Sequence, residues 1–406
     1  MDSSTGVSLV VIVCCSALAP VLSELLRKFK VPSVLFELLL GILVGPAVFN
    51  LASSTPTIHT LATLGLSFLF FLAGYEIEPR KIAGKPLLLG VSSWLMSLVL
   101  AFAFAFVLSL TGFVLSTLLV GLCLTTTAIG TLLPMVKDRG LVDSPFGTFL
   151  LAAGSVGEFG PVVLVTVLLG GKSSQVQFGL LVVFIVLAVV IVGIARRGQP
   201  PRVVEAMARN LHTSAQLPIR VVVLLIVLMV ALAVSLRVDL LLGAFAAGLV
   251  AKTAMSSQQS HDLEPKIEAI AFGFFIPIFF ITSGMAFDLH ALFGSAALKV
   301  PLYVVLLLVV RGLPALLVYR KVLGRSHRLA LALVQATGLP LIVVITTIGL
   351  EMESMRPSTA AALVAAGMIS VLVFPLLGFS ILDRGAGGSP LRKNLPSDDE
   401  ASAFDF

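Results

Sequence analysis

Long apolar runs fill most of this chain, and each has about the length of a membrane-spanning helix. A transmembrane α-helix needs about 20 mainly apolar residues, and a soluble domain carries about 25% charged residues. Here 58% of the 406 residues are apolar and 12% are charged. We therefore predict an all-α polytopic membrane protein, which leaves no room for a large soluble catalytic domain.

Polar residues, glycine and proline divide the apolar sequence into thirteen predicted spans. Their approximate limits are 6–26, 32–49, 57–77, 86–110, 113–136, 146–169, 177–195, 217–235, 239–255, 267–287, 297–319, 328–350 and 358–381.

The lysines and arginines predict the orientation of these spans, because cytoplasmic loops are enriched in both. Of the 27 basic residues, 22 fall in one set of alternate loops, four fall in the opposite set, and Arg311 lies inside a span. A missed or added span would spoil this split. We therefore expect the N-terminus outside and the C-terminus in the cytoplasm, in the inner or plasma membrane of the cell. The positive net charge follows from this orientation and does not imply nucleic-acid binding.

Two ionisable residues lie near the centres of predicted spans. Glu158 is close to the middle of the sixth span, and Arg311 is just past the middle of the eleventh. Charged side chains at this depth are energetically costly and usually functional. A structural ion pair between two helices is the alternative, but one carboxylate and one guanidinium in so apolar a chain favour a titrating site. Glu37, near the cytoplasmic end of the second span, either lines an inner vestibule or acts as a snorkelling or capping carboxylate.

The remaining polar residues are assigned no part in the site. Glu24 and Glu76 lie near span ends, and Asp239 is expected to cap a helix. The five histidines lie in loops or at span ends, and the three cysteines lie in apolar runs. The glycines near the C-terminus lack the strand and helix of a nucleotide-binding loop. No cofactor is therefore expected.

Two predicted spans contain residues that interrupt a helix. The fifth holds Thr125, Thr126, Thr127, Gly130 and Pro134, and the twelfth holds Gln335, Thr337, Gly338 and Pro340. If spans 1–6 and 8–13 are two halves joined by span 7, both interruptions fall in the fifth helix of a half, and the halves have opposite orientations. Interrupted helices at corresponding positions of inverted repeats indicate the binding site of a transporter.

Four segments also suggest a family: PSVL at 32–35 with GP at 45–46, LFFLAGYE at 69–76, TTTAI at 125–129 and PIFFITSGM at 277–285. Through them the chain resembles, over residues 6–381, the cation:proton antiporter superfamily, in the branch of Kef-type potassium efflux proteins and NapA-type sodium/proton antiporters. The resemblance implies inverted repeats with crossed discontinuous helices. It also implies that Glu158 is the ion- and proton-binding carboxylate, and that Arg311 is its basic neighbour.

The family fold implies a scaffold domain, usually a homodimer interface, and a core domain that moves against it like an elevator. Residues 1–110 would hold scaffold helices 1–3 and the first core helix, 111–170 core helices 5–6, and 171–216 a linker helix and cytoplasmic loop. Residues 217–290 would hold scaffold helices 8–10, 291–382 core helices 11–13, and 383–406 a disordered cytoplasmic tail.

The chain departs from the family pattern in three respects. Many members have a polar or acidic residue before the key carboxylate, where this chain has Gly157, and the key residue here is glutamate and not aspartate. The chain also stops at Phe406 without the nucleotide-binding domain of Kef-type proteins. This argues against Kef-type ligand gating, unless a separate regulatory subunit supplies the domain.

The residue chemistry predicts exchange of a monovalent cation for a proton. Burial disfavours the charged form of a carboxylate, and arginine does not deprotonate. Glu158 is thus expected to bind one Na⁺ or K⁺, or one proton, while Arg311 holds Glu158 or a neighbouring dipole when the cation is absent. The Thr126 and Thr127 hydroxyls, with backbone groups near Gly157 and in the broken segments, would complete the cation shell.

One exchanged charge would make the cycle electroneutral. The alternatives are a sodium-coupled solute symporter on a related scaffold, or a non-transporting membrane sensor. An intramembrane enzyme is disfavoured, because the sequence has no His-Glu-x-x-His motif and no buried Ser/His pairing.

Overall fold

The computed structural model describes residues 3–26, 31–76, 82, 84–137, 139–142, 144–169, 216–236, 240–254, 257–287, 289 and 295–386, with scattered residues between 176 and 193. Eight helices in this part of the chain are long and apolar enough to cross a membrane, and four further apolar helices are shorter. The prediction of an all-helical membrane fold is therefore confirmed.

The helices follow the predicted spans. The first half contains α1 (Ser3–Leu25), α2 (Ser33–Val44), α3 (Pro56–Glu76), α5 (Lys85–Leu110), α6 (Thr117–Leu124), α7 (Ile129–Lys137) and α8 (Pro145–Leu169). The second half contains α11 (Leu217–Ser235), α12 (Leu240–Ala254), α13 (Ser257–Ile270), η2 (Ala271–Phe275), α14 (Ile276–Met285), α16 (Ser295–Val318), η3 (Tyr319–Lys321), α17 (Arg325–Val334), α18 (Pro340–Glu351) and α19 (Pro357–Ala386).

Some predictions lie outside the described residues. These are most of the seventh span, the 196–215 part of the cytoplasmic loop, the tail beyond residue 386, and Asp239, His212 and His290. The count of thirteen spans and the inverted repeat therefore stay predictions. The beginning of the expected tail, residues 383–386, is helical and extends α19.

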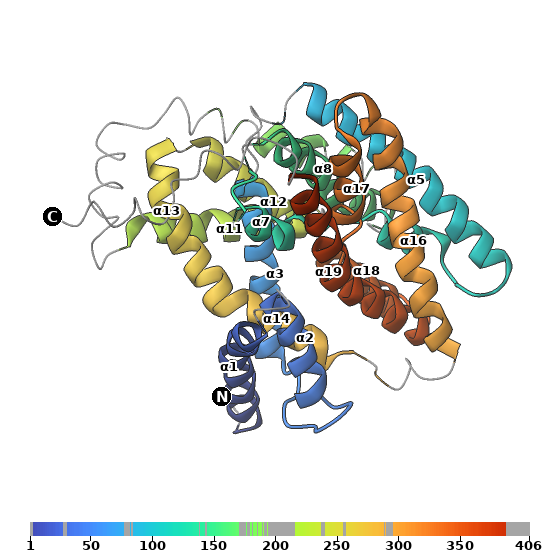
Figure 1. Ribbon diagram of the computed structural model, residues 1–406. Coiled ribbons are helices and arrows are strands. Elements are labelled where there is room, and N and C mark those ends of the chain that lie inside the picture. Colours follow the sequence, from blue (N-terminus) through green and yellow to red (C-terminus); the bar gives the residue numbers. More distant parts are fainter. Residues whose placement is uncertain are drawn as a thin grey trace.

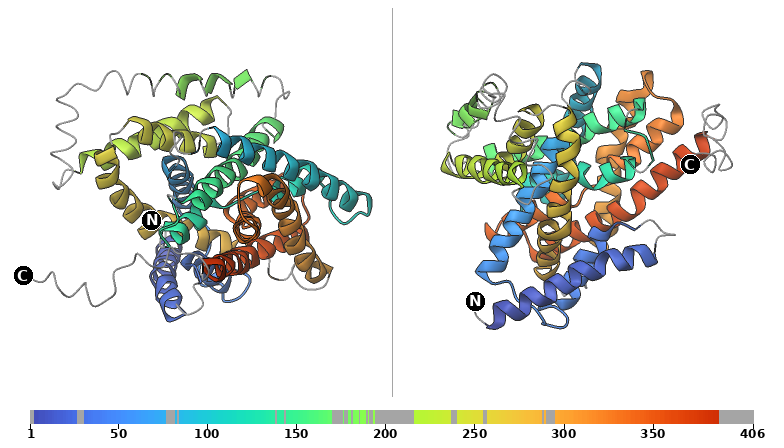
Figure 2. Two further views of the ribbon diagram at one scale, coloured as in Figure 1. Left: turned by 45° about the horizontal axis from the view of Figure 1, so that its top comes forward. Right: turned by 90° about the vertical axis from the view of Figure 1, so that its left-hand side faces the viewer.

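Packing divides the helices into two groups, which can be followed in Figures 1 and 2. In the first group α3 packs on α12, α14 and η2, α13 packs on η2, α2 packs on α14 and α1, and α11 packs on α12. In the second group α16 and α17 pack on α19, α5 packs on α6, α8 and α16, and α7 packs on α8. Between the groups, α7 lies against α3, and α8 lies against α12.

Glycines allow the closest helix contacts of the first group. A Cβ at Gly74 of α3 would strike the backbone oxygen of Phe245, and a Cβ at Gly248 of α12 would strike that of Phe71. Small residues let the backbones of membrane helices approach each other, and van der Waals packing then stabilises the pair. The α3–α12 contact is therefore backbone against backbone.

Two predicted spans are interrupted in the structure, as their sequences indicate. The fifth span stops at Leu124 and resumes at Ile129, which gives α6 and α7; the twelfth stops at Val334 and resumes at Pro340, which gives α17 and α18. Gly130 was expected in the first interruption, but it lies in the first turn of α7. Glycine is tolerated there because the first N–H groups of a helix have no intrahelical partner in any case.

Candidate functional site

The two helix interruptions contact each other, and donors of the first interruption bond to carbonyl oxygens of the second. The backbone N–H of Ala128 donates to the carbonyl oxygen of Thr337 (2.8 Å), and the Thr127 hydroxyl donates to the carbonyl oxygen of Gln335 (2.7 Å). A Cβ at Gly338 would collide with the Thr126 hydroxyl. The backbone of the second interruption therefore packs directly against the first interruption. Non-helical backbone at membrane depth requires such protein partners.

Glu158 lies at the point where the fifth span resumes. It projects from α8, is 3% exposed, and its Oε2 accepts a hydrogen bond from the N–H of Ile129, the first residue of α7 (3.2 Å). The preceding carbonyl oxygen, of Gly157, accepts the N–H of Thr127 (3.0 Å). A helix N-terminus stabilises negative charge. The chain thus places a buried carboxylate where the electrostatics of α7 favour it.

Arg311, from α16, lies beside the C-terminal end of α17, whereas Glu158 lies at the N-terminal end of α7. It is 1% exposed, and its Nε and Nη2 both donate to the Thr127 hydroxyl (3.0 and 2.6 Å). Nη1 donates to Ser97 (3.3 Å), and Nε also reaches the carbonyl oxygen of Gln335 (3.4 Å). Gln335 follows the last residue of α17, where unpaired carbonyls attract positive charge.

Glu158 and Arg311 form no ion pair with each other in the described part of the chain, so the structure gives no support to the alternative of a structural ion pair. Each has its own partners: Ile129 for the carboxylate, and Thr127, Ser97 and Gln335 for the guanidinium. Of the two expected roles of Arg311, the contact with a neighbouring dipole is the one observed.

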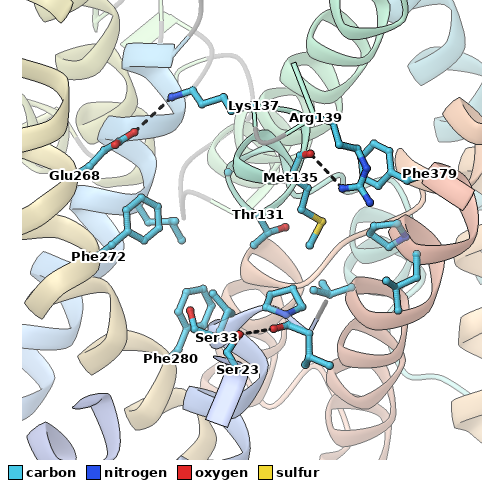
Figure 3. Close-up of a pocket in the computed structure, with 18 of the residues that line it drawn as sticks. Ser23, Ser33, Thr131, Met135, Lys137, Arg139, Glu268, Phe272, Phe280 and Phe379 are labelled. Carbon is cyan, nitrogen blue, oxygen red and sulfur yellow. Dashed lines mark hydrogen bonds and ion pairs between the residues drawn. The ribbon is translucent and has the colours of Figure 1, made fainter. Parts of the chain in front are cut away.

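A cavity of about 800 Å³ lies between the two helix groups (Figure 3). Gly130 and Thr131, close to the residue that binds Glu158, belong to its lining. Lys137 and Arg139 of the second group and Glu268 of the first also line it. The cavity therefore extends to the first turn of α7, and it is large enough to hold water molecules.

A second cavity, of about 90 Å³, lies beside the first. It is lined by Ile129 and by Ser155, one turn before Glu158 on α8. Glu76 and Lys137 line both cavities. Sequence reasoning gave Glu76 no role, because a carboxylate at a span end is ordinary; only the fold places it here. Glu24 also lines the larger cavity, whereas Glu37, buried in α2, lines neither.

Lys137 links the two helix groups through ion pairs. Its Nζ lies 2.8 Å from Glu264 and 3.4 Å from Glu268, both on α13. Figure 3 shows the contact between Lys137 and Glu268 among the residues that line the cavity. Since Lys137 ends α7 and Ile129 begins it, one short helix connects this ion pair to the residue that binds Glu158.

Interrupted helices that contact each other beside a buried carboxylate are typical of the binding sites of ion-coupled secondary transporters. The chain belongs to the sodium/hydrogen exchanger family, whose transmembrane-domain model matches residues 11–384. This confirms the resemblance to the cation:proton antiporter superfamily, whereas the Kef-type and NapA-type branch stays a prediction. The members of this family are transporters and not enzymes.

Two proteins are similar to this chain in sequence, and one solved structure is similar to it in fold. YjbQ of Bacillus subtilis is 26% identical over 402 residues, which cover 93% of this chain, and the chain spans 63% of YjbQ. The "Probable Na(+)/H(+) antiporter 3" of Methanocaldococcus jannaschii is 23% identical over 365 residues (88% of this chain, 92% of that protein). The structure of the sodium proton antiporter MjNhaP1 from the same organism superposes on this chain with a TM-score of 0.64 at 17% identity. The match covers 94% of this chain and 97% of that chain, and it supports the fold.

Proposed function

We propose that the protein exchanges a monovalent cation, Na⁺ or K⁺, for a proton, and that Glu158 is the site both ions share. The observation that carries this proposal is the buried carboxylate of Glu158, which accepts the first N–H of α7, has no ion pair among the described residues, and lies one turn from Ser155 in the wall of the smaller cavity. An isolated carboxylate in a dehydrated site must be neutralised, by a proton or by a cation.

The groups around Glu158 suit a small cation. The Thr126 hydroxyl donates to the carbonyl oxygen of Cys123 (2.9 Å) and keeps its lone pairs for a ligand. The carbonyl oxygen of Thr126 faces the same glycine, Gly338, as its hydroxyl does. Oxygen ligands of this kind bind hard cations.

The two helix groups, with a cavity between them, suit a transporter that opens alternately to each side of the membrane. We propose that the second group carries Glu158 past the first group like an elevator, with the first group as a fixed scaffold that forms a homodimer. The support is the cavity between the groups and the sparse contact across it, in which α7 meets α3 and α8 meets α12. Because either ion neutralises Glu158, the moving group would carry the same net charge in both directions.

The experiment is exchange in proteoliposomes that contain a pH-sensitive dye. A preformed pH gradient should collapse on addition of NaCl or KCl, and the two salts together give the ion preference. Collapse that needs an organic solute would indicate the symporter alternative. A wild-type protein that binds ions but dissipates no gradient would indicate the sensor alternative.

The exchange is expected to generate no membrane potential, because one positive charge moves in each direction at a single carboxylate. A potential-sensitive dye in the same proteoliposomes should stay unchanged while the pH gradient collapses, and an ionophore that clamps the potential should not alter the rate. A sodium-dependent potential would contradict one-for-one exchange.

Lys137→Gln is expected to weaken the hold between the two groups, since it removes both ion pairs to α13. Pairs this exposed contribute up to about 1 kcal/mol each, so the loss of both should shift the conformational balance by up to about 30-fold. The measurement is the labelling rate of a cysteine at Thr131, in the larger cavity, after Cys14, Cys15 and Cys123 have been replaced.

Arg139→Gln is the matched control, because it also removes a charge from the cavity wall. Its guanidinium lies 4.2 Å from the Phe379 ring, within the second group, so the link between the groups stays intact. Equal labelling rates for Lys137→Gln and wild type would contradict the role of Lys137.

A further inference from the structure

We infer that Thr127 is a positioning residue for Arg311 and not a ligand of the transported cation. With Gly157, it keeps the guanidinium away from Glu158, so that the carboxylate stays open to a cation. This inference rests on the proposed function, and it replaces the sequence-based expectation that both Thr126 and Thr127 coordinate the ion.

The hydrogen bonds of Thr127 leave no lone pair for a cation. A hydroxyl has one donor and two acceptor sites. The donor goes to the carbonyl oxygen of Gln335 (2.7 Å), and the two acceptor sites receive Nε and Nη2 of Arg311 (3.0 and 2.6 Å). Among the described residues, the hydroxyl of Thr126 uses only its donor, toward Cys123. Neighbouring threonines in one interruption therefore have different chemistry available.

Gly157 provides the space in which this contact forms. A Cβ at position 157 would collide with Nη2 of Arg311 and with the Thr127 hydroxyl. The guanidinium thus lies against the residue directly before Glu158, yet it donates to uncharged oxygens. All three of its nitrogens have such an acceptor: Thr127, Ser97 or Gln335.

Opposite charges attract strongly when little water separates them. A guanidinium released from Thr127 would have Nη2 without an acceptor, next to the residue that precedes Glu158, and a direct pair with the carboxylate would compete with Na⁺. The hydroxyl of Thr127 prevents this competition by accepting from Nη2. Arg311 then supplies positive charge to the interrupted helix ends without occupying the ion site.

Thr127→Val, which keeps the shape and removes the hydroxyl, is expected to raise the KM for Na⁺ about tenfold, the size of one lost charge-assisted hydrogen bond. The maximal exchange rate should change much less. Thr127→Ser should restore the wild-type KM to within about twofold. Gly157→Ala, which displaces the guanidinium directly, should reproduce the effect of Thr127→Val.

The decisive comparison repeats Thr127→Val in an Arg311→Gln background. If Thr127 acts through the guanidinium, the substitution should change the KM by less than about twofold there. A loss of about tenfold in both backgrounds would make Thr127 a cation ligand and overturn the inference. Stabilisation of the folded protein by Na⁺, read as a shift in Tm, gives the same comparison for variants too slow to assay.

A second result would also overturn the inference: an unchanged KM in Gly157→Ala. Neither outcome touches the proposed function, which fails separately if the wild-type protein shows no exchange driven by Na⁺ or K⁺.

Discussion

Glu158→Gln is expected to abolish cation/proton exchange, with a loss of about 100-fold or more. Glutamine has nearly the same shape and can still accept the hydrogen bond from Ile129, but it neither releases a proton nor offers a negative charge to Na⁺. The fold should therefore survive while the transported ions lose their common site. The measurement is collapse of a pH gradient in proteoliposomes, at matched amounts of reconstituted protein.

Two variants test whether this loss is specific to the charge at position 158. Glu158→Asp keeps the carboxylate on a shorter side chain and should retain part of the exchange. Glu351→Gln removes an exposed carboxylate at the end of α18, away from the interruptions, and should behave like wild type. Glu158→Gln with wild-type exchange would show that another group carries the proton.

Gly248→Leu is expected to prevent stable folding of the first helix group. The added side chain would have to enter the backbone of α3 at Phe71, and backbone cannot move aside as a flexible side chain can. Overpacking a well-packed site typically costs about 1–3 kcal/mol, and more when backbone blocks it. The Tm in detergent and the fraction of monodisperse protein on size exclusion should both fall.

Gly273→Leu is the control for this substitution. Gly273 also lies in a helical segment, but a Cβ there meets nothing within 4 Å, so the larger side chain should be tolerated. If Gly248→Leu and Gly273→Leu had the same Tm, the close approach of α3 and α12 would not limit stability.

The sequence predicts the helices well because the membrane imposes a strong rule on each one separately. An apolar run of about 20 residues must form a helix in lipid, whatever its neighbours are. The interruptions were also predictable, since threonines at 125–127 and the Gly338–Pro340 segment are locally unfavourable for a helix. These features depend on residues close together in the chain.

The contacts of the site were not predictable in the same way, because they join distant parts of the chain. Thr127 and Arg311 are 184 residues apart, and nothing local to either indicates that they meet. Opposite charges at similar depth suggested a pairing of Glu158 with Arg311, but the interrupted helix ends offer each charge a better partner. Lys137 resembles any lysine at the end of a span until α13 is placed opposite it.

The crossing of the two interruptions also orders the events of biosynthesis. The acceptor for the Thr127 hydroxyl, Gln335, is 208 residues later in the chain, which at ribosomal speed is a delay of roughly 10–40 s. During that interval the hydroxyl of Thr127 and the N–H of Ala128 lack their final acceptors, Gln335 and Thr337, and cannot face lipid. Until the second half is made, these groups of the N-terminal half need water or a chaperone as a hydrogen-bonding partner. A chain truncated before residue 335 would keep them without their final partners, and we expect it to be degraded.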